Sequence, residues 1–270
     1  MFRTRSLVIA LSDVHDEKTE AYQHSIIIFT RGTERFYMRR SCDSSNMFKI
    51  DVDELKAAAK EGHTAGELHG KELLIDPAQV FPECDPDYRR AELVPDVFCK
   101  NPCLLDYTDR NARENIRNYL AAEAWLYEKV LGPNPHESIV TYHGCSVENG
   151  RIAGICLDRL DQNLCSRRDN KEERLDVAKV VREVGEALAH LHRLGYCHND
   201  VNPQNIMVTK DDKAVLIDFD SCLRIGEPLT KAKGTMAGWG LGLTTSSVET
   251  DNHGLARVEQ YLMDPSMSVV

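Results

Sequence analysis

The alternation of hydrophobic and polar residues predicts short strands in the first part of the chain. Hydrophobic runs at 25–30 and 34–39 flank Arg31-Gly32-Thr33, and this arrangement favours a β-hairpin. An apolar run at 7–11 is shorter than the roughly 7–15 residues of a signal-peptide core, so it predicts another strand. Five prolines between residues 76 and 102 predict a segment that is mostly loop.

Two later segments have the period of an amphipathic helix. Hydrophobic residues recur every three or four positions from 113 to 131 and again from 171 to 194. His192, near the end of the second helix, is expected on the helix surface. Apolar runs at 139–143 and 152–157 predict two strands between the helices. Strands and helices in this order predict an α+β fold.

Composition and charge narrow the class of protein. The 270 residues are 42% hydrophobic, and Gly and Pro together number 16 + 10 = 26, which excludes wholesale disorder. The net charge of −10 makes a nucleic acid or an anionic membrane surface an unexpected partner. The nine cysteines form no C-x-x-C pair and resemble reduced intracellular thiols. No apolar run approaches the ~20 residues of a membrane span, so an intracellular location, cytoplasmic or nuclear, is expected.

The stretch after the second helix carries the candidate chemistry. Apolar runs at 206–209 and 214–217 predict a hairpin with a four-residue loop, in which the first residue of one run pairs with the last of the other. Asn205 and Asp218 then meet at the open end, and their oxygens suit Mg²⁺. Asp200 precedes the hairpin and can accept a proton from a substrate hydroxyl. A metal site beside a carboxylate base is typical of enzymes that transfer phosphoryl groups.

The stretch from Tyr196 to Asp220 resembles the catalytic and metal-binding loops of the protein kinase superfamily, H-x-D-x-x-x-x-N followed by D-F-x. The resemblance implies ATP and Mg²⁺ as cofactors, Asp200 as base, and Asn205 and Asp218 as metal ligands. Asp220 stands where the pattern has Gly, and is either a third metal ligand or a turn cap. The H-N-D and D-F-D variants look most like short, divergent fungal kinase-like proteins.

The resemblance extends upstream. V-F-C-K resembles the V-A-I-K strand, which nominates Lys100 for the α- and β-phosphates. The predicted helix 113–131 then matches the mobile helix whose Glu pairs with that Lys. Glu123 fits this role best, and Glu128 is the alternative. By the same resemblance the hinge around the adenine includes Leu157, Asp158 and Leu160.

Departures from the family pattern leave three functions open. Asn202 stands where Ser/Thr kinases carry a Lys, and no glycine between Gly70 and Gly132 supplies a phosphate-binding loop. The leading expectation is an enzyme that phosphorylates Ser/Thr hydroxyls of a protein substrate. A pseudokinase that binds nucleotide with little turnover is the second. The third is a small-molecule kinase acting on a small alcohol, because choline and aminoglycoside kinases share the H-N-D loop.

The positions of these motifs imply a two-lobed protein-kinase-like fold. Residues 71–158 would form the small lobe and residues 159–270 a truncated C-lobe. Residues 1–70 would be an N-terminal extension, or divergent strands of the small lobe. The segment Lys233–Trp239 resembles the G-T-x-x-Y/W end of an activation segment.

Overall fold

The chain divides into two compact units. A computed structural model describes residues 6–15, 22–41, 71–169, 175–209, 211–229, 239, 241–264 and 266–267. The first unit comprises residues 1–83 and 102–118, and the second comprises residues 84–101 and 119–270. The predicted boundaries at residues 70 and 158 stay predictions. Most of the expected activation-segment motif, residues 233–238, lies outside the described residues.

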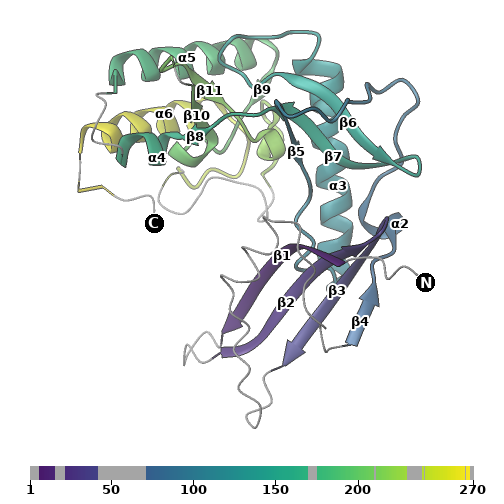
Figure 1. Cartoon of the computed structure of the whole chain (residues 1–270). Helices are drawn as coiled ribbons and strands as arrows, with labels where there is room; N and C mark the ends of the chain where they lie inside the picture. Colours follow the sequence, from purple (N-terminus) through teal and green to yellow (C-terminus); the bar gives the residue numbers. More distant parts are fainter. Residues whose placement is uncertain are drawn as a thin grey trace. The chain divides into compact units, whose positions relative to one another are not determined.

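The first unit is built on an antiparallel sheet (Figure 1). Its strands, in order, are β1 (Ser6–His15), β2 (Tyr22–Arg31), β3 (Glu34–Ser41) and β4 (Lys71–Leu74). The predicted hairpin is confirmed as β2 and β3, and Gly32 takes a φ of 67° in the turn between them. A short helix, α2 (Pro77–Val80), follows β4, with the Asp76 side chain as its N-cap.

The second unit contains a three-stranded antiparallel sheet in the order β5-β7-β6. Its strands are β5 (Val97–Lys100), β6 (Tyr142–Glu148) and β7 (Arg151–Asp158). The predicted strand at 139–143 was placed too early, because only Ile139 bridges to Leu216 and the regular strand starts at Tyr142. Asn149 and Gly150 both have positive φ, which makes the tight turn between β6 and β7.

The first predicted helix is α3 (Arg110–Leu126), and it continues as one π-helical segment, η1 (Tyr127–Leu131). The N–H of Gly132 closes this segment on the carbonyl of Tyr127. A wider π turn shifts the side chains that follow it relative to an α-helix. The hydrophobic period of the sequence gave the extent of this helix within three residues, but not the change of winding.

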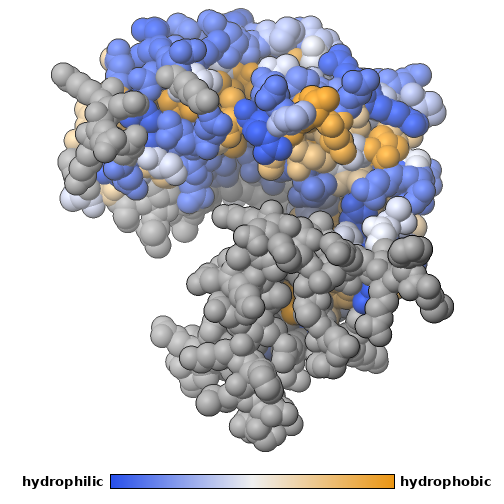
Figure 2. Space-filling model, in the orientation of Figure 1, coloured by the Kyte–Doolittle hydropathy of each residue, from blue (hydrophilic) through white to orange (hydrophobic). Residues whose placement is uncertain are grey.

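The rest of the second unit is mostly helical. Its regular elements are β8 (Gln162–Asn163), α4 (Leu164–Asp169), α5 (Val177–Arg193), β9 (Tyr196–Cys197), η2 (Pro203–Asn205), β10 (Ile206–Val208), β11 (Ala214–Leu216), η3 (Phe219–Ser221), β12 (Leu223–Arg224) and α6 (Val248–Met263). Helix α5 packs against α6 and β11 (Figure 1). Its buried stripe confirms the predicted amphipathic helix, and its outer face is hydrophilic in Figure 2. In the described part of the chain, no helix is long and apolar enough to cross a membrane.

The register of the β10–β11 hairpin differs from the prediction by one residue. Ile206 pairs with Leu216, and not with Ile217. The cause is a longer turn: Thr209 and Lys213 close it by a backbone hydrogen bond of 3.0 Å, and Asp212 adopts a φ of 54° within it. Asn205 therefore lies opposite Ile217, one residue before Asp218.

Candidate functional site

Lys100 joins two acidic side chains from distant parts of the second unit. Its Nζ lies 2.8 Å from Glu123 Oε1 and 3.0 Å from Oε2, and 2.7 Å from Asp218 Oδ1. Lys100 ends strand β5, Glu123 lies on α3, and Asp218 follows β11. The Glu123 side chain is only 4% exposed, whereas Lys100 is 27% and Asp218 is 37% exposed. The structure thus brings together three of the predicted site residues.

The three charges adjust one another's pKa. Burial lowers the pKa of Lys100, but Glu123 and Asp218 outweigh burial and hold it above the usual range. Burial raises the pKa of Asp218, yet the Lys100 ammonium draws it below its ordinary value. Burial raises the pKa of Glu123, and the contact with Lys100 opposes that rise. Lys100 is therefore protonated and positively charged at neutral pH.

Glu128, the alternative partner for Lys100, has a different task. Its Oε1 accepts the Arg89 N–H at 2.6 Å and the Tyr142 hydroxyl at 2.8 Å. Glu128 therefore ties the segment before β5 to strand β6. Of the two glutamates, only Glu123 is bonded to Lys100.

Asp200 and Asn205 form a second group, on the loop between β9 and β10. The Asn205 Nδ2 donates to Asp200 Oδ2 at 2.8 Å and to the Asp200 carbonyl at 2.9 Å. Asn202 is buried in the same loop, where it donates to the Asp200 carbonyl and accepts the N–H of Gln204. Its side chain therefore serves the loop itself, and it caps the 3₁₀ turn η2.

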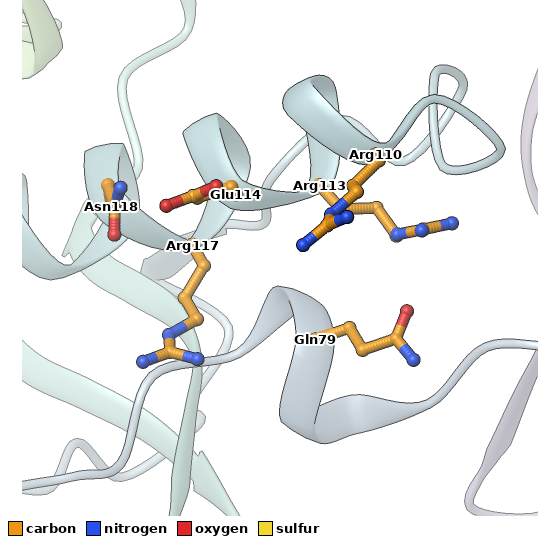
Figure 3. A pocket seen from close by; sticks show the side chains of 6 residues that line it. All are labelled: Gln79, Arg110, Arg113, Glu114, Arg117 and Asn118. Atoms are coloured by element: carbon orange, nitrogen blue, oxygen red, sulfur yellow. The ribbon is translucent and has the colours of Figure 1, made fainter.

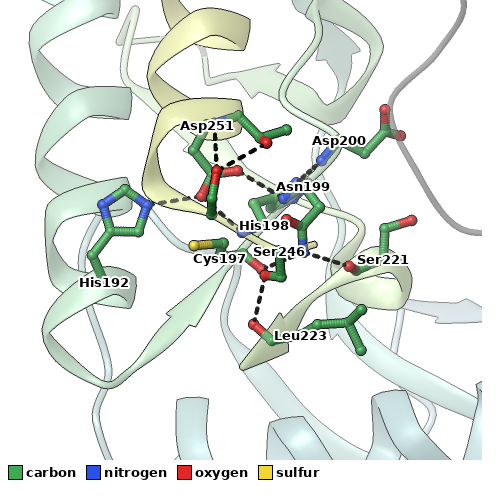
Figure 4. Close-up of polar contacts among 11 residues, drawn as sticks. His192, Cys197, His198, Asn199, Asp200, Ser221, Leu223, Ser246 and Asp251 are labelled. Atoms are coloured by element: carbon green, nitrogen blue, oxygen red, sulfur yellow. Dashed lines mark hydrogen bonds and ion pairs between the residues drawn. The ribbon is translucent and has the colours of Figure 1, made fainter. Parts of the chain in front are cut away.

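The sequence did not reveal what holds this loop, which is Asp251 on α6. Its carboxylate is completely buried and accepts the backbone N–H groups of His198 and Asn199 at 2.9 and 2.7 Å (Figure 4). Asn199 has a φ of 64°, in the left-handed region that non-glycine residues seldom adopt. The buried carboxylate thus stabilises an unusual backbone turn directly before Asp200.

His192 was expected on the helix surface, and that prediction was wrong. Its Nε2 lies 2.8 Å from Asp251 Oδ2, and its side chain is 14% exposed (Figure 4). Two features of the sequence could have indicated the burial of His192 and the helix that carries Asp251. His192 follows Leu188 by four residues and so lies on the buried stripe of α5. Ser247, with acidic residues in the turn after it, is a typical start for helix α6.

A column of ring contacts runs from His198 through Phe219 and Tyr127 to Tyr142. Phe219 is buried, with its ring 5.0 Å from His198 and 5.8 Å from Tyr127, both edge to face. Tyr127 stacks on Tyr142 at 5.2 Å. The column connects the loop of Asp200 with η1 and β6, and it fixes Phe219, the residue that follows Asp218.

The oxygen ligands suit a hard divalent cation. Asp218 has a φ of 63°, and its carboxylate is partly exposed. Asn205 directs its amide nitrogen to Asp200, which leaves its amide oxygen as the possible ligand. Asp220 accepts the Ser221 hydroxyl at 3.0 Å. A carboxylate-and-amide set of this kind fits Mg²⁺.

The predicted hinge residues lie at the end of β7 and just after it. Leu157 is buried opposite Phe98. The backbone N–H of Asp158 donates to the Thr141 carbonyl, and its carboxylate bonds to His143. Leu160 has no hydrogen bond to another described residue. The Asp158 N–H is thus already occupied, whereas the Leu160 N–H can bind a ligand.

A cavity of about 360 Å³ lies elsewhere, in the first unit. It is lined by Gln79, Arg110, Arg113, Glu114, Arg117 and Asn118 (Figure 3). None of the predicted site residues lines it. Arg113 is fixed there by a hydrogen bond to the Tyr107 carbonyl, and its guanidinium lies over the Tyr107 ring.

Comparison with known proteins agrees with this geometry. The protein kinase domain model matches residues 107–238, a range that includes Glu123 and the loops at Asp200 and Asp218 but begins after Lys100. A serine/threonine-protein kinase of Drosophila persimilis is 23% identical over 195 residues, which cover 69% of this chain and 23% of the relative. One of Caenorhabditis elegans is 32% identical over 140 residues, 48% of this chain and 14% of the relative.

The mouse MAPK/MAK/MRK overlapping kinase is 34% identical over 94 residues, 33% of this chain and 22% of that protein. The chain spans less than a quarter of the length of these relatives. The mixed helices and strands fit an α+β kinase-like fold. The match to the protein kinase domain model and the names of these relatives support membership of the protein kinase superfamily.

Proposed function

We propose that this chain is an ATP- and Mg²⁺-dependent phosphotransferase of the protein kinase type, acting on Ser/Thr hydroxyls of a protein. The observation that carries the proposal is the bridge from Lys100 to Asp218, which joins residues 118 positions apart in the sequence. Structural stability alone does not call for a partly exposed cluster of three charges, because such pairs contribute little to folding.

The nucleotide is held by residues from several elements. Lys100, positioned by Glu123, binds the α- and β-phosphates, and the Leu160 N–H binds the adenine edge beside Leu157. Asp218 and Asn205 are the ligands for Mg²⁺, with Asp220 as a third. Bound Mg²⁺ neutralises the charge that develops on the phosphates during transfer.

Asp200 acts on the acceptor. The Asn205 amide orients Oδ2 of Asp200, and the Asp200 carboxylate accepts the proton of a substrate hydroxyl. The hydroxyl oxygen bonds to the γ-phosphorus as the bond to ADP breaks. Asn202 is committed to the loop, so the charge of the usual Lys must come from Lys100 and the metal.

Binding requires a rearrangement. Asp218 Oδ1 is engaged by the Lys100 ammonium at 2.7 Å, so this ion pair must loosen when the phosphates and the metal bind. Glu123 keeps Lys100 in place during the exchange, because both of its oxygens are bonded to Nζ.

The first test is ligand-dependent thermal unfolding. Mg²⁺ and ATP at about 100 times the dissociation constant should stabilise the wild type by about 2.7 kcal/mol, a shift of about 5 °C or more. Asp218→Asn should lose most of the Mg²⁺-dependent part. Asp211→Asn, at the exposed tip of the hairpin, is the matched control and should behave as the wild type. A wild type that does not respond to nucleotide would contradict the proposal.

The second test identifies the acceptor. Transfer of labelled γ-phosphate to generic Ser/Thr protein substrates is the expected outcome. Transfer only to a panel of amino alcohols would favour a small-molecule kinase, a function that Asp220, two residues after Asp218, also fits. Nucleotide binding with no transfer to either panel would make the chain a pseudokinase.

A further inference from the structure

Two cysteines face each other behind the strand that carries Lys100. Cys99 on β5 is the register partner of Cys156 on β7. Side chains alternate along a strand, so Cys99 lies on the face opposite Lys100. Cys156 is completely buried, whereas Cys99 is partly exposed.

The backbone hydrogen bonds near the two cysteines show whether they form a hydrogen-bonded or a non-hydrogen-bonded pair of the antiparallel ladder. Val97 is the register partner of Asp158. The Val97 N–H donates to Val94 and the Asp158 N–H donates to Thr141, so these partners do not bond to each other. Because bonded and non-bonded pairs alternate along an antiparallel ladder, the Cys99–Cys156 pair, two positions on, is also non-hydrogen-bonded.

Such a pair has the spacing that a disulfide needs. Opposite residues at non-hydrogen-bonded positions lie about 4.5 Å apart at Cα, inside the 4.4–6.8 Å range of disulfides. The Cys99 side chain also affects the buried thiol. A hydrogen bond to Cys99, together with burial, raises the pKa of Cys156.

The neighbouring backbone leaves room for the sulfur of Cys99. A Cβ on Gly154 would lie 2.7 Å from Cys99 Sγ, so the sulfur occupies the space that a side chain at 154 would take. The Cys99 thiol also donates to Asn101 Oδ1 at 3.7 Å. The register already places Cys99 opposite Cys156, so a bond between the two sulfurs needs no change in the pairing of β5 with β7.

We propose that Cys99 and Cys156 are an oxidation site, at which a peroxide converts the two thiols into a cross-strand disulfide. The Cys99 sulfur attacks hydrogen peroxide, the O–O bond breaks, and water leaves as Cys99 becomes a sulfenic acid. The Cys156 sulfur then attacks the Cys99 sulfur, the S–O bond breaks, and a second water leaves. Two thiols and one peroxide thus give one disulfide and two waters.

The order of attack follows from exposure. Cys99 is the accessible thiol, and buried Cys156 resolves the sulfenic acid. The bridge fixes β5 to β7 at the residue before Lys100. This inference does not depend on nucleotide binding or on phosphoryl transfer.

Tryptic mapping tests the proposal directly. Trypsin releases residues 91–100, with Cys99 as the single cysteine, and residues 152–159, with Cys156 as the single cysteine. After peroxide treatment and alkylation of the remaining thiols, the two peptides should appear joined, with two hydrogens fewer than their sum. A reductant should separate them. Recovery of the two peptides apart, or a bridge from either one to another cysteine, would overturn the proposal.

Variants and a stability measurement complete the test. Cys156→Ser should abolish the bridge and leave Cys99 oxidised singly, whereas Cys103→Ser, which removes a nearby exposed thiol, should leave the bridge intact. The oxidised wild type should unfold at a higher temperature, by on the order of 5 °C, and Cys156→Ser should not. A bridge that lowers the unfolding temperature would show a strained, non-native pairing and contradict the inferred geometry.

Discussion

The two halves of the candidate site are held by different forces. The loop before Asp200 is fixed by backbone N–H groups that donate to the completely buried carboxylate of Asp251. Lys100 is fixed by ion pairs to Glu123 and Asp218, and part of this cluster is open to solvent. Both arrangements place a charged group accurately, but only the second contains partners that a ligand can replace.

The two kinds of contact differ in how easily they open. If the two N–H groups lost Asp251 as their acceptor, each would be left buried and unsatisfied, at a cost of about 1–3 kcal/mol. The hydrogen bonds to Asp251 therefore hold the loop in one conformation. A partly exposed ion pair costs far less to open, because water screens the separated charges. We infer that the acceptor side of the site is preformed and that the nucleotide side rearranges.

Replacement of Asp251 should have the largest effect on stability. Asp251→Ala leaves two buried N–H groups without an acceptor, and the expected loss is about 4 kcal/mol in urea unfolding. Asp251→Asn retains one acceptor oxygen and should lose about half as much. Asn252→Ala, on the exposed side of the same helix, should change stability by less than about 0.5 kcal/mol. Equal losses in Asp251→Ala and Asn252→Ala would break the comparison.

The two glutamates of α3 and η1 give a matched pair for the nucleotide side. Glu123→Gln removes the charge that orients Lys100, and we expect ATP affinity to fall by about tenfold, equivalent to about 1.4 kcal/mol. Glu128→Gln weakens the contacts to Arg89 and Tyr142 and should reduce stability with little change in ATP affinity. Calorimetric titration with Mg²⁺ and ATP separates the two. A larger loss of affinity in Glu128→Gln would contradict the assignment of Glu123.

The pH dependence of folding tests the Lys100–Asp218 pair. The pKa of Asp218 is lower in the folded chain than its ordinary value of 3.8. Its contribution is therefore fully present above about pH 4 and is lost as the pH falls through the lowered value. The free energy of unfolding of the wild type should fall more steeply below pH 4 than that of Asp218→Asn. Comparison with this variant removes the opposite contribution of Glu123, whose pKa is raised.

The smallest expected effect concerns the ring column that connects the halves. The Tyr127 hydroxyl is buried and has no hydrogen-bond partner among the described residues. Tyr127→Phe keeps the stacking on Tyr142 and removes the unsatisfied group. Thermal unfolding should show unchanged or slightly higher stability, by up to about 1 kcal/mol. A clear loss of stability would mean that the hydroxyl makes a contact that stabilises the fold.

The sequence could predict most of the charged groups of the candidate site. The Asp200 and Asp218 loops lie within one short stretch, so their spacing alone indicated the chemistry. Lys100 and Glu123 are 23 residues apart, and the resemblance of V-F-C-K and of the following helix to the protein kinase family nominated both. Local pattern and a family resemblance therefore identified the groups that touch one another in the structure.

The sequence could not supply the support behind these groups. Asp251 lies 52 residues after Asn199, and nothing local to either residue indicates their contact. The one-residue error in the β10–β11 register arose because Asp212 adopts a left-handed conformation that lengthens the turn. The π-helical segment at Tyr127 likewise leaves no mark on a hydrophobic period of three or four residues. Each of these depends on tertiary packing.

The central claim is that Asp200 accepts the proton of an acceptor hydroxyl during phosphoryl transfer. The most direct measurement is single-turnover transfer of labelled γ-phosphate by the wild type and by Asp200→Asn at saturating Mg²⁺ and ATP. The rate for Asp200→Asn should fall by a factor of at least about 100, with nucleotide binding unchanged. A rate within about threefold of the wild type would contradict the account.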